Sequence, residues 1–118
     1  MSSDQEIEQE IVAKGLTKPR VTAADVEREI FSEHYFTAAE GALGASPEGG
    51  VFLQPPDLKL LTFCVLVMRN GFTVVGQSAC AHPENFDAEV GRKLARRNAV
   101  SDAWRLLGFR LRDQLAAQ

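Results

Sequence analysis

The sequence has few of the features that mark membrane, secreted or disulfide-rich proteins. Its longest apolar stretch, around residues 60–68, is far shorter than the roughly 20 residues that a membrane-spanning helix needs. Two cysteines in 118 residues do not make a disulfide scaffold. The first ten residues are acidic and lack an apolar core, so we expect no signal peptide and a cytoplasmic location. Apolar residues make up 45% of the chain and charged residues 25%, which is typical of a soluble globular domain.

Motifs of metal, nucleotide and nucleophilic sites are also missing. The two cysteines and two histidines do not have the spacing of a zinc site, and no glycine-rich stretch is followed by Lys-Ser/Thr. Cys80 and His82 could form a thiol–imidazole pair, but no residue that would orient the imidazole can be placed, so we favour structural roles. We interpret Glu33-His34 as a solvated helix end rather than an acid–base pair. We therefore predict no enzyme activity, no cofactor and no metal.

Charge is unevenly distributed along the chain, although the net charge is only -3. Residues 1–57 hold eleven acids and four bases, a net charge of -7, whereas residues 58–118 hold five acids and nine bases, a net charge of +4. Four bases fall within six residues: Arg92, Lys93, Arg96 and Arg97. On a helix, like charges four residues apart repel by about 0.2–0.5 kcal/mol. The basic segment therefore either binds phosphates or an acidic partner, or it lies on a solvated helix face or pairs with the acidic half of the chain.

Local patterns predict a polar N-terminal helix and linker over residues 1–20, followed by a single α+β domain over residues 21–118. Ser3 with Glu6, and Thr22 with Asp25, have the spacing of capping boxes at the starts of two helices. The second of these helices is expected to run to about Tyr35. Residues 41–57 contain four glycines and three prolines and are predicted to be a connector, with a brief edge pairing over residues 51–53.

A β-hairpin is the strongest local prediction. Two apolar, β-branched runs flank Asn70-Gly71, a dipeptide that favours a two-residue type I′ turn. In that register the numbers of paired residues sum to 141, Val74 shares a face with Phe63, and Cys64 and Cys80 point to opposite faces. The two thiols would then lie roughly 10 Å apart, which is too far for a disulfide. Both faces of the first strand are apolar, so we expect it to be central or covered on both sides.

A long C-terminal helix is predicted from about Glu84 to Leu107, with Gly108 at its end and an ambiguous tail after it. Mostly small residues recur along one face of this helix: Ala88, Gly91, Ala95, Ala99, Ala103 and Leu106. Such a face lets the helix lie close to a sheet. A second apolar stripe consists of Phe86, Val90, Val100, Trp104 and Leu107. A homodimer would bury that second stripe. The expected fold is N-terminal helices, a central antiparallel hairpin of two or three strands, and a long C-terminal helix packed on the sheet.

Two resemblances bear on function. Residues 92–104 resemble the second helix of double-stranded-RNA-binding domains, which implies that Arg92, Lys93 and Arg96 contact phosphates. Residues 21–111 resemble a family of small tailed-phage proteins named for gene product 49 of an enterobacterial phage and gene 66 of a Shigella phage. The matching segments are residues 33–38, 61–66, 70–76, 78–80, 84–87, 91–96 and 98–100. The sequence at residues 104–109 departs from the family's usual Trp-x-Leu-Glu-Gly-Tyr. This second resemblance implies a phage or prophage origin and a location in the host cytoplasm, and it implies no mechanism.

We therefore predict a non-enzymatic phage accessory protein that binds a host or phage protein, in a role such as host takeover or counter-defence, with no membrane partner. The alternative is a module that binds duplex nucleic acid through Arg92, Lys93, Arg96 and Arg97. The near-neutral net charge argues mildly against strong nucleic-acid affinity, because backbone binding depends on released counterions.

Overall fold

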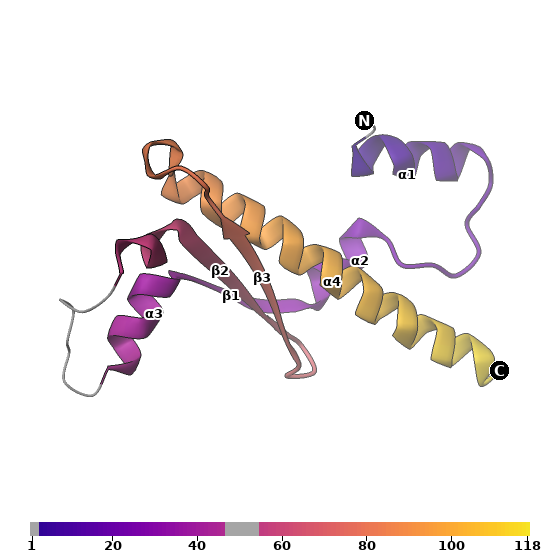
Figure 1. Ribbon diagram of the computed structural model, residues 1–118. Coiled ribbons are helices and arrows are strands. Elements are labelled where there is room, and N and C mark those ends of the chain that lie inside the picture. The colour runs from indigo at the N-terminus through magenta and orange to yellow at the C-terminus, as the bar shows by residue number, and fades with distance from the viewer. Residues whose placement is uncertain (1–2, 47–54) are drawn as a thin grey trace.

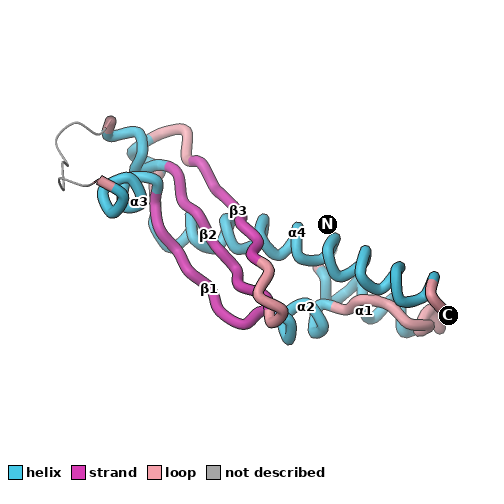
Figure 2. Tube along the Cα trace, turned by 90° about the horizontal axis from the view of Figure 1, so that it is seen from below, coloured by secondary structure: helices cyan, strands magenta, loops and turns pink. Residues whose placement is uncertain are grey.

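The computed structural model describes residues 3–46 and 55–118. Three strands, β1 (Ile30–Thr37), β2 (Leu61–Met68) and β3 (Thr73–Ala79), form an antiparallel sheet in the order β1-β2-β3 (Figure 1). Helix α4 (Ala88–Ala116) lies across one face of this sheet, against β2 and β3, and extends past it (Figure 2). The predicted α+β fold with a long C-terminal helix on an antiparallel sheet is confirmed. The third strand is β1, whereas the edge pairing expected over residues 51–53 lies outside the described residues.

Short helices precede, interrupt and follow the strands. They are α1 (Asp4–Ala13), α2 (Ala23–Glu29), α3 (Ala38–Ala45) and two 3-10 turns, η1 (Pro56–Leu60) and η2 (Pro83–Asn85). Helix α1 buries no residue and lies away from the sheet (Figure 1). Helix α2 packs beside α4. No helix in the described ranges is long and apolar enough to cross a membrane.

Both predicted N-terminal helix starts are confirmed. The Ser3 hydroxyl accepts a hydrogen bond from the Glu6 amide at 3.1 Å. Thr22 and Asp25 form a complete, reciprocal capping box. The next prediction is wrong, because α2 ends at Glu29 and residues 30–37 form a strand instead of continuing the helix to Tyr35. This segment is rich in β-branched and aromatic residues, and pairing with β2 outweighs its helical apolar spacing.

Helix α3 occupies part of the segment that was expected to be a connector. A capping box between Thr37 and Glu40 starts it directly after β1. Its Gly41 lies against the Phe36 ring, because a Cβ at that position would be 3.2 Å from two ring carbons. Helix α3 therefore packs over one end of β1.

The hairpin exists, but its register differs from the prediction by one residue. The Met68 amide donates to the Phe72 carbonyl at 2.8 Å, and the Gly71 amide donates to the Met68 carbonyl at 2.9 Å. Gly71 has a φ of +89°, whereas Asn70 is not in the positive-φ region. The loop is therefore the three-residue type with glycine in the left-handed position, and not a two-residue type I′ turn.

This shift exchanges the two faces of β3 relative to β2. Leu66 pairs with Val74, which is buried on the helix side, and so the predicted sharing of a face by Val74 and Phe63 is wrong. Cys64 and Cys80 are both free thiols, as predicted. The observed register does not support the predicted opposite faces, because Cys64 pairs with Gly76. Cys80 lies four residues beyond Gly76, roughly 13 Å along the strand direction, and this distance keeps the thiols apart.

The core lies between α4 and the inner face of the sheet. Its α4 side consists of Ala95, Ala99, Ala103 and Leu107, which confirms the small-residue face except at its ends, because Ala88 and Leu106 are exposed. A Cβ at Gly76 of β3 would lie 2.2 Å from both the Ala95 carbonyl oxygen and the Ala99 amide nitrogen. The backbones of β3 and α4 therefore touch directly.

Helix α4 differs from its predicted limits at both ends. Asp87 caps it through the Val90 amide at 2.9 Å, so the helix begins at Ala88 instead of Glu84. It continues through Gly108, which lacks the left-handed conformation that would stop a helix, and it includes most of the ambiguous tail. The second apolar stripe is partly covered within the chain, because Val100 and Trp104 pack against the core and Leu107 belongs to it.

Candidate functional site

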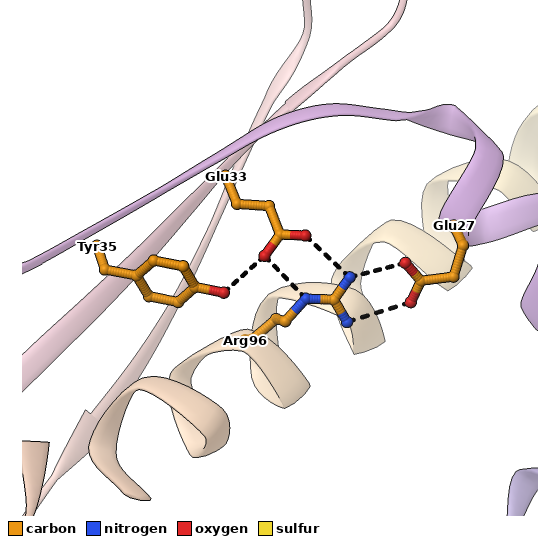
Figure 3. A network of polar contacts seen from close by, with 4 residues as sticks. All are labelled: Glu27, Glu33, Tyr35 and Arg96. Atoms are coloured by element: carbon orange, nitrogen blue, oxygen red, sulfur yellow. Dashed lines mark hydrogen bonds and ion pairs between the residues drawn. The ribbon is translucent and has the colours of Figure 1, made fainter. Parts of the chain in front are cut away.

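The four bases at the start of α4 differ in exposure and in their partners, and they do not form one cluster. Arg96 is only 29% exposed at its side chain, and its guanidinium contacts two carboxylates (Figure 3). It donates to Glu27 at 2.7 and 3.1 Å and to Glu33 at 3.0 and 3.1 Å. Glu27 lies in α2 and Glu33 in β1, so one arginine of the basic half joins two acids of the acidic half.

Tyr35 completes this network from the same strand as Glu33 (Figure 3). Its hydroxyl donates to a Glu33 carboxylate oxygen at 2.6 Å. The hydrogen bonds from Arg96, and then from Tyr35, hold the pKa of Glu33 below its usual value of 4.5. Burial and the neighbouring Glu33 carboxylate raise the pKa of Tyr35. Glu33 is therefore ionised and doubly bound, which makes it a poor general acid or base.

The other three predicted site residues have different surroundings. Lys93 is exposed and lies 3.3 Å from Glu89 of the same helix, a surface pair that contributes little to stability. Arg92 and Arg97 are exposed and form no ion pair with any described residue. Arg96 therefore does not share the exposure of its neighbours, and its two carboxylate partners disfavour a phosphate contact.

One further ion pair joins the acidic and basic halves of the chain, and another lies within the acidic half. Arg110 of α4 lies 3.4 Å from Glu29 at the end of α2. Arg20 donates to Glu8 of α1 through Nη1 at 2.7 Å, and this bond lowers the pKa of Glu8. Two arginines of the basic half, Arg96 and Arg110, therefore pair with three acids of the acidic half.

The residue pairs considered for catalysis have structural partners. The Cys80 thiol donates to the His82 backbone carbonyl at 3.2 Å, while His82 Nδ1 accepts from the Glu84 amide at 3.1 Å and caps η2. The predicted helix end at Glu33-His34 is wrong, because both residues lie on strand β1. Nε2 of His34 lies 3.0 Å from the Ser32 hydroxyl. Among the described residues, no group of three or more His, Cys, Asp or Glu side chains could hold a metal ion.

The structure has two apolar surfaces outside the core, and sequence reasoning missed the second. On the outer face of the sheet, away from α4, β2 presents a row of half-buried side chains: Leu61, Phe63, Val65 and Val67. Beside β3, a groove against α4 is lined by large apolar residues that are 41–71% exposed: Phe72, Val75, Leu106 and Phe109. The apolar residues on both faces of β2 carried a signal for the first surface. The second surface could not be predicted, because it requires the correct hairpin register and a helix that continues beyond Gly108.

Comparison with known families matches residues 21–115 to the phage protein (N4 Gp49/phage Sf6 gene 66) family. The chain belongs to this family. The match begins just before α2 and ends within α4, so α1 lies outside it. No curated protein and no solved structure matches the chain. Membership of a phage protein family supports a phage accessory protein, and the local resemblance to double-stranded-RNA-binding domains stays a prediction.

Proposed function

We propose that the protein is a non-enzymatic accessory protein of a phage or prophage that acts in the host cytoplasm by binding a host or phage protein. One observation carries this proposal: β2 is apolar on both faces, but α4 covers only the inner face. β2 is the central strand, as one alternative of the sequence prediction had it, and its outer apolar face is open to a second cover. A binding partner would supply the second cover.

The outer face of the sheet has the make-up of a protein-binding surface. The apolar row of β2 extends to Val75 of β3, which pairs with Val65, and polar side chains border it, among them Ser32 and His34 of β1 and Gln77 of β3. Helix α3 reaches one end of this face through Phe36, whose ring lies 5.4 Å from that of Phe63. Of the other described helices, none packs along the middle of the face. Apolar patches with polar borders are typical of protein-interaction sites.

The polar contacts support the non-enzymatic part of the proposal. The Cys80 thiol binds a backbone carbonyl, and the His82 ring accepts a backbone amide, so neither activates the other. Glu33 is held by Arg96 and Tyr35. Each candidate catalytic group in the described chain therefore already has a structural role.

A pull-down from host lysate, with and without nuclease, tests the proposal. The variant Val65→Glu places a charge in the middle of the outer face, while Arg92→Ala with Arg97→Ala is the matched control on the basic segment. We expect a protein partner that survives nuclease and the control substitutions and is lost with Val65→Glu. Circular dichroism checks that each variant is folded. Capture that depends on Arg92 and Arg97 and disappears with nuclease would contradict the proposal.

The second candidate function is duplex nucleic-acid binding through Arg92, Lys93 and Arg97. The exposure of Arg92 and Arg97, without ion pairs in the described chain, favours it. This function predicts an affinity that falls steeply with salt and weakens for all sequences alike when Arg92 and Arg97 are replaced. An absence of any salt-sensitive shift with DNA or RNA would remove it.

A further inference from the structure

The two edges of the sheet are protected very differently. Strand β1 carries an irregularity between Ile30 and Ser32 and the charged residue Glu33. Strand β3 contains no charged residue and no proline. Natural proteins use bulges, charges and prolines to prevent edge strands from pairing with other chains. The β3 edge has none of these devices within the strand itself.

Hydrogen bonds at the two ends of the hairpin show which groups of β3 face outward. The Met68 amide bonds the Phe72 carbonyl, and the Cys80 amide bonds the Leu60 carbonyl. Because hydrogen-bonded pairs alternate with non-bonded pairs in an antiparallel ladder, the even-numbered residues of β3 bond to β2. The amides and carbonyls of Thr73, Val75 and Gln77 therefore point away from the sheet.

One of these outward groups is already occupied. The side-chain amide of Asn98 in α4 donates to the Gln77 carbonyl at 2.7 Å. Thr73 and Val75 together present two amides and two carbonyls at the open edge, and in the described chain these have no such partner. The free stretch lies directly beside the groove that Thr73 and Val75 help to line.

The groove adds apolar surface and two opposite charges. Phe72 is 58% exposed and Phe109 is 71% exposed, and an aromatic side chain can bury ~150–250 Å². Asp102 and Arg105, one turn apart on α4, also line the groove and have no ion pair among the described residues. A surface that carries both signs can be complementary to a copy of itself.

We propose that a second copy of this chain occupies the edge of β3, forming a symmetric dimer by antiparallel β3–β3 pairing. A two-fold axis at Val74 places Thr73 opposite Val75 of the second copy, and the reverse. This register uses all four free groups on each chain and leaves Asn98 bound to Gln77. The two sheets would join into one of six strands.

The same axis runs the two α4 helices antiparallel on one side of the joined sheet. Asp102 can then approach Arg105 of the second copy, and Phe72 and Phe109 become covered. A standard interface buries about 800 Å² per partner, near one tenth of this chain's accessible surface of 8601 Å². The dimer is independent of the proposed function, because the outer face of the sheet stays open.

Light scattering after size exclusion, over a range of protein concentrations, tests the dimer. We expect a dimer for the natural chain and a monomer for Val75→Pro, which removes an outward amide without touching the ladder to β2. Val75→Thr keeps this amide and is the matched control that stays dimeric. Phe109→Glu, on the exposed side of α4, is expected to weaken dimerisation at least tenfold with an unchanged circular dichroism spectrum.

Two results would overturn the proposal. One is a natural chain that is monomeric at every concentration. The other is a dimer that persists in both Val75→Pro and Phe109→Glu, which would place the interface elsewhere. Capture of a partner protein by the outer face, tested with Val65→Glu, is read separately, so failure of the dimer and failure of the proposed function are distinguishable.

Discussion

Helix α4 has two sides with different residues: small buried side chains face the sheet, and exposed charged side chains face solvent. The side against the sheet requires small side chains, because Ala95 and Ala99 touch the backbone of Gly76. The side away from the sheet carries exposed bases such as Arg92 and Arg97. Arg96, next to buried Ala95, belongs to neither side and is held by carboxylates from α2 and β1. A run of like charges in sequence is therefore divided between two environments, exposed and carboxylate-bound.

The largest effect is expected on the sheet-facing side. Gly76→Ala would place a Cβ 2.2 Å from backbone atoms of Ala95 and Ala99, which no rotamer change can relieve. Overpacking of this kind costs about 1–3 kcal/mol and occasionally more, and backbone-to-backbone contact puts this case at about 3 kcal/mol or above. Urea unfolding followed by circular dichroism measures the loss.

Gly108→Ala is the matched control for that substitution. Nothing lies within 4 Å of a Cβ at Gly108, and its φ is not positive. Alanine in a helix interior is favoured over glycine by about 0.8–1.0 kcal/mol, so this variant should be more stable than the natural chain. A Gly76→Ala protein as stable as the natural one would show that α4 does not lie this close to β3.

A moderate effect is expected at Arg96. Arg96→Met keeps much of the side-chain volume but leaves Glu27 and Glu33 without their shared cation. Hydrogen bonds to charged groups contribute about 1.5–3 kcal/mol, and the partial exposure of this network lowers the expected loss to about 1–2 kcal/mol. A double-mutant cycle with Glu33→Gln measures the coupling. A loss no larger than that of Arg92→Met would contradict a structural role for Arg96.

The same network predicts a pH dependence. Because the folded pKa of Glu33 lies below its usual 4.5, its contribution to stability is complete above that value and declines as the pH falls through the lower folded pKa. The free energy of unfolding of the natural chain should therefore fall more steeply in acid than that of Glu33→Gln. Urea titrations above and below pH 4.5 measure how the free energy of unfolding changes with pH in the two proteins. An equal change in both would mean that Arg96 does not hold Glu33 ionised.

The sequence predicted features that depend on neighbouring residues better than those that depend on distant ones. Caps at Ser3 and Thr22 and the small face of α4 were predictable because each rests on a local spacing. The strand at residues 30–37 was not, because its pairing partner β2 follows it by more than 20 residues. The predicted hairpin register was wrong because only Gly71 is left-handed, whereas a type I′ turn needs positive φ at both Asn70 and Gly71.

The candidate site shows the same division. The basic segment was visible in the sequence, but the engagement of Arg96 depended on Glu27 and Glu33, which lie 69 and 63 residues away. The groove beside β3 lies between the hairpin loop and the C-terminal half of α4. The hairpin register and the end of α4 were both predicted incorrectly. Surfaces built from segments far apart in the chain carry no local signal.

The smallest effect is expected on the solvent side of α4. Arg92→Ala with Arg97→Ala should change the free energy of unfolding by no more than ~0.5 kcal/mol, because neither side chain has an ion pair in the described chain. The change should also leave partner capture intact. A fluorescence anisotropy titration with duplex DNA and RNA at two salt concentrations tests the second candidate function. That function predicts that these substitutions weaken a salt-sensitive complex.

The most direct test of the proposed function is photo-crosslinking in the infected host. A photoreactive residue at Val65, on the outer face of the sheet, is compared with one at Arg97, on the solvent side of α4. We predict a protein adduct from position 65 and none from position 97. An adduct that forms only from position 97, or one that carries nucleic acid, would contradict binding through the open face of the sheet.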